Sequence, residues 1–430
     1  MRFVIGLLVA TFVVAFVVAP APAGAQAAPP YDAASVIVKY RADVPDTRRR
    51  DVERRAGVSR LRSLRTGADL LRTDQDPAQV AAGLSRDPAV EYAEPNYLIR
   101  IGSVPPPIFP TDPDFSDQYH LHNTGQTGGV ADADIDAPEG YFTLAQAGIP
   151  GAPVKVGIVD TGIDIGHEDL AANVIGCARS TGLFNGGINE GSCKDGNSHG
   201  THVAGIVAAR AGNGQGGAGV AFNARLIICK AFDNNGNGTV ADVSDCLLWT
   251  WQQGAKVINM SFGFGADSAT LRQAVENVFQ LGLVQGATLV ASAGNVLPGQ
   301  QGTQVFPAAY SQVIAVSATN DRDNLAVFGS GQVSNTGTFV DVAAPGDDVL
   351  SSVVGDAYDE FDGTSMAAPI ATGVIAAVRS RFPALSAQGA FNRLIATVDD
   401  LGIPGRDNAF GHGRVNLCNA LATTAAQECP

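Results

Sequence analysis

Short runs rich in Val and Ile alternate with longer helical patterns over most of the chain, from Asp117 onward. The strand-like runs include VKVGIV, ARLIICKAF, KVINMSF, TLVASA, QVIAVSA and FVDVAA, and the helical stretches include SHGTHVAGIVAAR and TLRQAVENVFQLG. Continuous apolar strands that alternate with helices are typical of a parallel sheet covered on both faces. We therefore predict an α/β domain of three layers, with a mainly parallel sheet between two layers of helices.

The first residues predict a secretory signal. Arg2 is followed by an apolar stretch from Phe3 to Ala19 and then by two A-x-A sites, Ala23-Gly24-Ala25 and Ala25-Gln26-Ala27. The stretch is shorter than the roughly 20 residues of a membrane-spanning helix, and the arrangement is typical of a cleaved signal peptide. We expect residues 1–27 to be removed and the product to be secreted, either extracellular or periplasmic.

Two further segments precede the α/β domain. Residues 28–100 contain two strand patterns and two helix patterns, which predict a small α+β unit. Residues 101–117 include GSVPPPIFPTDPDF, whose prolines prevent regular structure and favour an exposed, extended connector. The α/β domain is then expected over residues 118–430.

The charge of the chain excludes two classes of partner. Acidic residues outnumber basic residues, which gives a formal net charge of −14. Such a chain does not attract nucleic acid or an anionic membrane, and no later segment is long and apolar enough to cross a bilayer. We expect a monomer that binds neither nucleic acid nor, once the signal is removed, a membrane.

The six cysteines all follow position 176, and export would place them in an oxidising compartment. Six cysteines allow 15 pairings. We favour the pairings that close short loops: Cys177 with Cys193, Cys229 with Cys246, and Cys418 with Cys429. The alternative for Cys229, which lies in the apolar run LIICKAF, is a free thiol in the core.

Ser365 begins a long run of small and apolar residues, SMAAPIATGVIAAV. A serine hydroxyl becomes a nucleophile when an imidazole takes its proton, a carboxylate orients that imidazole, and donors stabilise the oxyanion. The chain offers one candidate for each role at a strand end or a helix start: Asp160, His199 and Asn295. Singly, each could instead be a helix cap, a structural histidine or a turn residue.

Four motifs together resemble a known family. VGIVDTGID, SHGTHVAG, ASAGN and GTSMAAP are similar to the Asp, His, oxyanion-Asn and Ser signatures of the subtilisin-like serine proteases, and they occur in the same order. The resemblance extends from about Gln118 to the GHGRVN motif near Asn416. It implies the subtilisin-like fold and a serine endopeptidase that acts on proteins and peptides.

The resemblance also implies a role for each catalytic candidate. Ser365 would be the nucleophile, and His199 would be the general base and then the general acid. Asp160 would hold His199 in the required tautomer. Asn295 would join the backbone N–H of Ser365 in the oxyanion hole.

Further expectations about substrate binding follow from the resemblance. Ser261, Phe262 and Gly263 would belong to an edge strand to which the substrate backbone adds by β-pairing. Ala293 and Gly294 would form the other wall of the S1 pocket, with Val305 as a further candidate. Because this set of residues carries no charge, we expect uncharged, mostly apolar residues at P1.

The resemblance gives the remaining segments a role as well. Residues 28–100 would be an inhibitory propeptide that assists folding and is removed by self-cleavage between Tyr97 and Gln118. Asp169 and Asn213 would match two ligands of a structural calcium site, for which carboxylate and amide oxygens are suitable. The family needs no cofactor for its chemistry.

The chain departs from the family pattern at two places. Pro369 is followed by Ile370-Ala371-Thr372-Gly373, where the family usually has His-Val-Ala-Gly, and Asp362 occupies a position that is more often Ser or Asn. Two alternatives to a general endopeptidase stay open at this point. One is a processing protease of narrow specificity, and the other is an inactive binding protein with the same fold.

Overall fold

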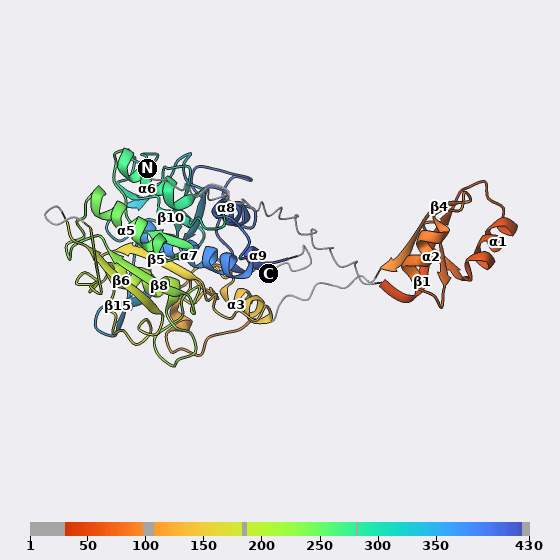
Figure 1. Cartoon of the computed structure of the whole chain (residues 1–430), viewed down its shortest axis with the longest axis horizontal. Helices are drawn as coiled ribbons and strands as arrows, with labels where there is room; N and C mark the ends of the chain where they lie inside the picture. The colour runs from red at the N-terminus through yellow and green to blue at the C-terminus, as the bar shows by residue number, and fades with distance from the viewer. Residues whose placement is uncertain (1–30, 98–106, 183–186, 281–282, 424–430) are drawn as a thin grey trace, which may run out of the picture. The chain divides into compact units, whose positions relative to one another are not determined.

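The computed structural model of the chain describes residues 31–97, 107–182, 187–280 and 283–423 (Figure 1). The expected signal peptide, part of the expected processing region and Cys429 lie outside these residues. The chain divides into two compact units, Met1–Ile101 and Gly102–Pro430, and each is described by itself. Among the described helices, none combines the length and apolarity that a bilayer-spanning helix needs.

The N-terminal unit is a four-stranded antiparallel sheet with two helices. The strand order is β2-β3-β1-β4. The elements are β1 (Tyr31–Tyr40), α1 (Asp46–Ala56), β2 (Ser59–Ser63), β3 (Asp69–Arg72), α2 (Pro77–Leu84) and β4 (Val90–Tyr97). The sequence patterns predicted β1, β4 and both helices but not β2 and β3, because β2 is an exposed, Arg- and Ser-rich strand without an apolar alternation.

The C-terminal unit contains an eight-stranded sheet in the order β14-β12-β10-β9-β5-β8-β6-β7. Every neighbouring pair is parallel except β6 and β7, which are antiparallel. The strands are β5 (Lys155–Asp160), β6 (Val174–Ser180), β7 (Ile188–Glu190), β8 (Arg225–Lys230), β9 (Val257–Met260), β10 (Thr288–Ser292), β12 (Val313–Thr319) and β14 (Val342–Pro345). The prediction of a mainly parallel sheet is therefore confirmed.

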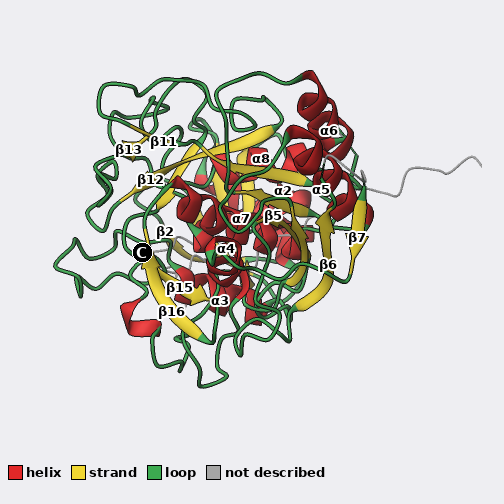
Figure 2. Cartoon of the chain, turned by 90° about the vertical axis from the view of Figure 1, so that its left-hand side faces the viewer, coloured by secondary structure: helices red, strands yellow, loops and turns green. Residues whose placement is uncertain are grey.

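Helices cover both faces of this sheet. The helices are α3 (Ala137–Gln146), α4 (His199–Ala208), α5 (Val240–Gln252), α6 (Ala269–Phe279), α7 (Thr364–Arg381), α8 (Ala387–Ile395) and α9 (Leu417–Leu421), after a short 3-10 turn, η1 (Phe115–Asp117). Figure 2 shows α4 beside α7 and α5 beside α6, and each pair encloses its own hydrophobic core with the sheet. Strands β10 and β12 are buried along their whole length, which explains their continuous apolar sequences.

Two small antiparallel pairs lie outside the main sheet. They are β11 (Asn295–Val296) with β13 (Val333–Ser334), and β15 (Val349–Val353) with β16 (Ala357–Phe361). The first pair begins at Asn295, and the second leads directly into the segment that precedes Ser365. The first pair therefore holds Asn295, and the second leads the chain to Ser365.

Two of the three expected disulfides are present. Cys177 bonds to Cys193, and Cys229 bonds to Cys246, which joins β8 to α5. The alternative of a free core thiol at Cys229 is therefore wrong. The third expected pairing involves Cys429, which lies outside the described residues.

The end of the Pro-rich segment is buried in the C-terminal unit, although its composition predicts an exposed connector as far as Phe115. Asp112 and Phe115 are both buried, at 5% and 7% exposure. The Asp112 carboxylate accepts backbone N–H groups of the loop from Gly212 to Gly214, and Phe115 belongs to the hydrophobic core that also contains α4 and α7. The exposed connector expected over Gly102–Phe115 therefore ends before Asp112.

Candidate active site

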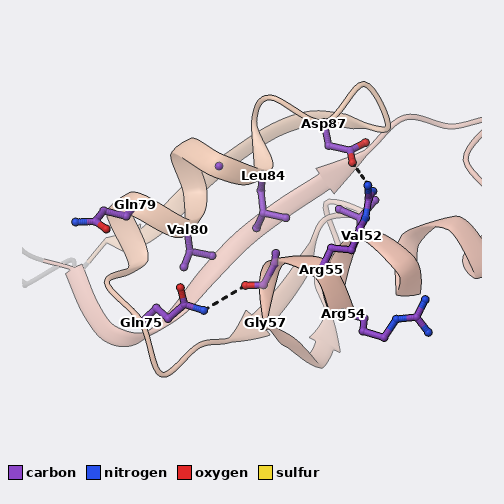
Figure 3. Close-up of a pocket in the computed structure, with 11 residues that line it drawn as sticks. Val52, Arg54, Arg55, Gly57, Gln75, Gln79, Val80, Leu84 and Asp87 are labelled. Atoms are coloured by element: carbon purple, nitrogen blue, oxygen red, sulfur yellow. Dashed lines mark hydrogen bonds and ion pairs between the residues drawn. The ribbon is translucent and has the colours of Figure 1, made fainter.

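The largest hollow among the described cavities, of about 580 Å³, lies on the N-terminal unit between α1 and α2 (Figure 3). Arg55 forms an ion pair with Asp87 there at 2.8 Å, and Gln75 donates to the carbonyl of Ala56 at 3.5 Å. The hollow is lined by Val52, Arg54, Arg55, Ala56, Gly57, Gln75, Gln79, Val80, Gly83, Leu84 and Asp87. Because this lining contains no Ser, His or Cys, we assign it no chemistry.

A smaller cavity, of about 180 Å³, lies at the carboxyl ends of β5 and β9. It is lined by Asp160, Thr161, Asn197, His199, Phe232, Gly236, Ser261 and Phe262. A second cavity, of about 340 Å³, continues beyond Phe232 and Phe262 over apolar residues of α5 and α6. This is the edge of the sheet at which a parallel α/β fold binds its ligands.

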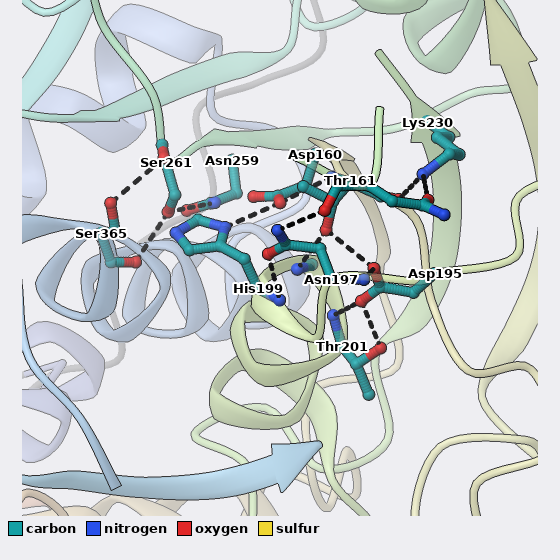
Figure 4. Close-up of polar contacts among 12 residues, drawn as sticks. Asp160, Thr161, Asp195, Asn197, His199, Thr201, Lys230, Asn259, Ser261 and Ser365 are labelled. Carbon is teal, nitrogen blue, oxygen red and sulfur yellow. Dashed lines mark hydrogen bonds and ion pairs between the residues drawn. The ribbon is translucent and has the colours of Figure 1, made fainter. Parts of the chain in front are cut away.

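The site is organised around a contact between a carboxylate and an imidazole (Figure 4). Asp160 is the last residue of β5 and is 2% exposed, and His199 is the first residue of α4. Their side chains meet at 2.8 Å, between Oδ1 of Asp160 and Nδ1 of His199. The backbone N–H of Thr161 donates to the same Oδ1 at 2.7 Å, which fixes the carboxylate.

The electrostatics around His199 favour a protonated ring. Burial lowers the pKa of the His199 imidazole, but the charge and hydrogen bond of Asp160, with the charge of Asp195, outweigh it and raise the pKa overall. The contact with Asp160 keeps a proton on Nδ1 and leaves Nε2 of the neutral ring as an acceptor. The other histidine of the motif, His202, is fully buried, and burial lowers its pKa to about 3.

A second carboxylate, Asp195, was not predicted from the sequence, and it bonds residues close in sequence to both Asp160 and His199. Asp195 is 1% exposed, and its oxygens accept four hydrogen bonds from Thr161, Asn197 and Thr201. These donors satisfy the charge so well that the pKa of Asp195 is lowered although burial raises it. The hydroxyl of Thr161 also accepts the backbone N–H of Gly200 at 2.9 Å. Asp195 thereby links the end of β5 to the start of α4.

Ser365 lies beside this pair, at the second position of α7. Its Oγ donates to the backbone carbonyl of Ser261 at 3.2 Å, and the described hydrogen bonds include none from Ser365 to His199. Figure 4 shows the edge of the His199 ring opposite Asp160 turned toward Ser365. A rotation of the Ser365 side chain would exchange the carbonyl acceptor for the imidazole.

Asn295 also lies next to Ser365, but it does not end a strand as expected. β10 ends at Ser292, and Asn295 begins β11 after the turn at Gly294. The side-chain oxygen of Asn295 accepts both the N–H and the hydroxyl of Thr364, at 3.0 and 2.8 Å. Because these donors occupy the oxygen, the NH₂ group makes no hydrogen bond within the described residues, and it lies beside Gly363, two residues before Ser365. Thr364 was not predicted from the sequence.

The candidate substrate-binding residues form two facing walls. Ala293 and Gly294 are held by Asn335, whose amide donates to the Ala293 carbonyl at 2.9 Å and whose N–H donates to the Gly294 carbonyl. A side chain at Gly263 or at Gly294 would collide with or crowd Val305. Val305 therefore lies between the two walls.

The prediction of an edge strand around these residues is wrong in part. β9 ends at Met260 and lies in the interior of the sheet, between β5 and β10. Phe264, three residues past Ser261, pairs with Phe306 through two backbone hydrogen bonds. The backbone groups of Phe262 and Gly263 make no hydrogen bond within the described residues, so they are free to pair with another strand.

The two expected metal ligands contact each other from different segments, because Asp169 precedes β6 and Asn213 lies in the loop after α4. The amide of Asn213 donates to Oδ1 of Asp169 at 2.6 Å, and the hydroxyl of Tyr358 donates to Oδ2 at 2.9 Å. Asp112, which was not predicted, binds the backbone of the same loop. Within the described residues, no group of three or more His, Cys, Asp or Glu side chains is arranged to hold a metal ion.

Asp362, one of the two departures from the family pattern, braces two loops. Its carboxylate oxygens accept the backbone N–H groups of Asp348 at 2.9 Å and of Gly329 at 3.2 Å. Burial, followed by the charge of Asp362, raises the pKa of the nearby Asp347 to about 6. Asp362 thus adds a third carboxylate to a cluster that contains Asp347 and Asp348.

An α/β sheet that holds a carboxylate–imidazole pair beside a serine at a helix N-terminus is the arrangement of a serine hydrolase. The model of the Subtilase family, peptidase S8, matches residues 151–413, and the chain belongs to that family. The model of the fervidolysin N-terminal prodomain matches residues 19–96. The chain is therefore a subtilisin-like serine endopeptidase with an N-terminal prodomain.

Individual relatives agree with this family. The thermophilic serine proteinase of Bacillus sp. (strain AK1) is 35% identical over 80% of this chain and 75% of that protein. Subtilisin DY of Bacillus licheniformis is 41% identical over 63% of this chain and 91% of that protein. The solved structure of a protease from Pseudoalteromonas arctica has a TM-score of 0.61 at 28% identity, covering 73% of this chain and 98% of that one.

The contacts of Asp195 lead to a prediction about His199. Replacing Asp195 by Asn removes a negative charge that favours the imidazolium, so the pKa of His199 should fall, as an NMR titration of the imidazole would show. The Asn side chain also places an NH₂ group against buried donors of Thr161, Asn197 or Thr201 that now bond a carboxylate oxygen. We therefore expect a loss of about 2–4 kcal/mol in the free energy of unfolding.

Asp407→Asn is the matched control for this prediction. Asp407 also accepts backbone N–H groups, from Ile403, Ala409 and Phe410, and it does not face His199. The control should lose stability without changing the His199 titration. An unchanged His199 pKa in a folded Asp195→Asn variant would contradict the assigned electrostatics.

Proposed function

We propose that the chain hydrolyses internal peptide bonds of proteins through an acyl-enzyme formed on Ser365. The observation that carries the proposal is the 2.8 Å contact of His199 with Asp160, next to Ser365 at the start of α7. A general base needs a fixed tautomer and a nucleophile within reach, and this contact supplies the first requirement.

In the proposed chemistry, His199 accepts a proton and then returns it, first when the acyl-enzyme forms and again when it is hydrolysed. As Oγ of Ser365 attacks the scissile carbonyl carbon, Nε2 of His199 takes the hydroxyl proton, and Asp160 stabilises the imidazolium. His199 then returns this proton to the leaving amine, and the acyl-enzyme forms. In the second half of the reaction His199 takes a proton from a water molecule, whose oxygen attacks the acyl carbon. The bond between that carbon and Oγ of Ser365 then breaks, His199 returns the proton to Oγ, and the new carboxyl group leaves.

The negative oxygen of each tetrahedral intermediate needs donors that are already in place. The Asn295 amide is such a donor, because Thr364 fixes its orientation. The backbone N–H of Ser365 is the second, because the first N–H groups of a helix have no partner within the helix. The positive end of the α7 dipole acts in the same direction.

The proposed substrate binds between the two walls of the site. Its backbone would pair with the free backbone groups of Phe262 and Gly263, and its P1 side chain would enter between Gly263 and Gly294. Val305 limits the depth of this space, and no charge lies on either wall. We therefore propose uncharged, mostly apolar P1 residues. The larger apolar cavity beyond Phe262 would take a substrate side chain further from the scissile bond.

A peptidyl phosphonate tests both the nucleophile and the P1 preference. The mature enzyme should be labelled on Ser365, as peptide mass spectrometry would show, and Ser365→Ala should not be labelled. A phosphonate with Leu or Phe at P1 should label at least about tenfold faster than the same reagent with Lys, because a pocket without a carboxylate leaves the ammonium unpaired. A folded mature enzyme whose Ser365 stays unlabelled would be a binding protein, not a protease.

We further propose that the chain is exported and cuts off its own prodomain. Two relatives are named as extracellular proteases, from Bacillus subtilis and Natrialba magadii. The N-terminal unit has its own hydrophobic core of β1, β3, β4 and both helices, which suits a separate inhibitory domain. We propose that residues 28–100 form this inhibitor and that the mature enzyme is a monomer. We further propose that the cut, expected between Tyr97 and Gln118, falls before Asp112, because Asp112 and Phe115 are buried in the C-terminal unit.

The self-processing proposal predicts the behaviour of one variant. Ser365→Ala, expressed in a host without other serine proteases, should accumulate as the uncut chain that retains residues 28–100, as intact mass would show. Adding a small amount of active wild-type enzyme should restore the cut. Efficient cutting of Ser365→Ala alone would assign the processing to another enzyme.

We also propose a structural calcium ion near Asp169 and Asn213, with Asp112 as a third ligand. The donor chemistry fits, because two carboxylates and one amide meet around a single loop, and calcium prefers such oxygen ligands. When bound, the ion would hold the loop after α4 and the segment before η1 together. It would take no part in peptide hydrolysis.

EDTA should lower the melting temperature of the mature enzyme by about 5 °C, the shift expected when an ion bound at about 100 times its dissociation constant is removed. Asp169→Asn should start from a lower melting temperature and respond less to EDTA. Equal responses of the wild type and Asp169→Asn would place any bound calcium elsewhere.

A further inference from the structure

The backbone carbonyl of Ser365 has lost its ordinary partner. In an α-helix a carbonyl accepts the N–H of the residue four positions later, and the residue four positions after Ser365 is Pro369. Proline has no N–H, so the helix itself leaves this carbonyl unpaired. The hydroxyl of Ser261 donates to it instead, at 2.8 Å.

Two buried side chains continue this contact into the interior. The amide NH₂ of Asn259, on β9, donates to the hydroxyl oxygen of Ser261 at 2.9 Å. The hydroxyl of Thr372 donates to the amide oxygen of Asn259, also at 2.9 Å. Asn259 and Thr372 are both fully buried, so water does not compete for these groups. We call Thr372, Asn259 and Ser261 the α7 relay.

The α7 relay runs in one direction only. Because Thr372 donates to the amide oxygen, the NH₂ of Asn259 must face Ser261. Because the oxygen of Ser261 accepts that NH₂, its proton is free to point at the Ser365 carbonyl. The orientation of each donor therefore depends on the preceding hydrogen bond, and the first donor of the series is the Thr372 hydroxyl.

Thr372 is one of the residues at which this chain departs from its family. It belongs to the Ile370–Gly373 segment, where the family usually has Ala in its place. A buried Thr in a helix commonly donates to the carbonyl four residues earlier. Here the hydroxyl donates across to β9, to a residue 113 positions away.

We propose that Thr372 is a positioning residue that acts on the nucleophile Ser365 through Asn259 and Ser261. The proposal rests on the proposed role of Ser365. Without the Thr372 hydroxyl, the amide oxygen of Asn259 has no donor in a dry interior, which is costly. Rotation of the amide would let this oxygen accept the Ser261 proton, and the Ser365 carbonyl would then lose its donor.

The mature Thr372→Val enzyme tests the proposal, because Val keeps the shape and removes the hydroxyl. We expect kcat on a peptide substrate to fall about tenfold with KM unchanged within about twofold, and the rate of phosphonate labelling to fall in parallel. Thr372→Ser, which keeps the hydroxyl, should restore kcat to within about twofold of the wild type.

A double-mutant cycle distinguishes a relay from a general loss of stability. In a Ser261→Ala background, Thr372→Val should cause little further loss of kcat, because its path to Ser365 is already broken. Thr250→Val is the matched control: Thr250 is a fully buried helical Thr whose hydroxyl donates only to carbonyls of its own helix, α5. It should lower the melting temperature and leave kcat unchanged.

Two results would overturn the proposal: an unchanged kcat in folded Thr372→Val, or additive losses in the double variant. If Thr372→Val does not fold, Thr372→Ala removes the same hydroxyl, and the same two results apply to it. An unlabelled Ser365 in the wild type would instead refute the proposed function. A labelled wild type with an unaffected Thr372 variant would refute the relay alone.

Discussion

The packing of α7 across the parallel sheet is the interaction on which the rest of this structure depends. Nearly every residue of the helix is buried, and the helix contacts β9, β10, β12, β14 and α4. Small side chains permit this close approach, and a residue as small as Gly373 is required where α7 meets Val220. Because α7 cannot shift without disturbing the core, Ser365 at its start stays fixed relative to the strand ends that carry Asp160 and, through α4, His199.

Polar groups are buried around the site at little cost in free energy because their hydrogen bonds are satisfied. Asp195 illustrates the balance: its carboxylate is almost inaccessible to water, yet four donors around it lower its pKa. The same donors are the N–H groups and hydroxyls that hold the start of α4, so one carboxylate caps a helix and orders the site. A hydrophobic residue in its place would leave those donors unpaired in the interior.

Much of this arrangement could be predicted from the sequence, because it depends on local pattern. Continuous Val- and Ile-rich runs identified the parallel strands, and Asp160, His199 and Ser365 lie at the element ends that the sequence predicts. The residues whose roles the sequence did not reveal act through tertiary contacts: Thr364, Asp195, Asn259, Thr372 and Asp112. The contact of Ser261 with Ser365 spans 104 positions, and no periodicity reveals such a pair. The order of strands could not be predicted from the sequence either. The resemblance implied an edge strand at Ser261 to Gly263, whereas β9, which ends just before them, lies between β5 and β10.

Pro369 decides which part of the molecule holds the backbone carbonyl of Ser365. A residue with an N–H at this position would anchor the Ser365 carbonyl within α7, and the first turn would move with its own helix. With proline there, the carbonyl is anchored to Ser261 in the segment that follows β9, the same segment that is proposed to pair with the substrate backbone. In the proposed function, Ser365 and the bound peptide would therefore be held by one and the same segment, Ser261 to Gly263.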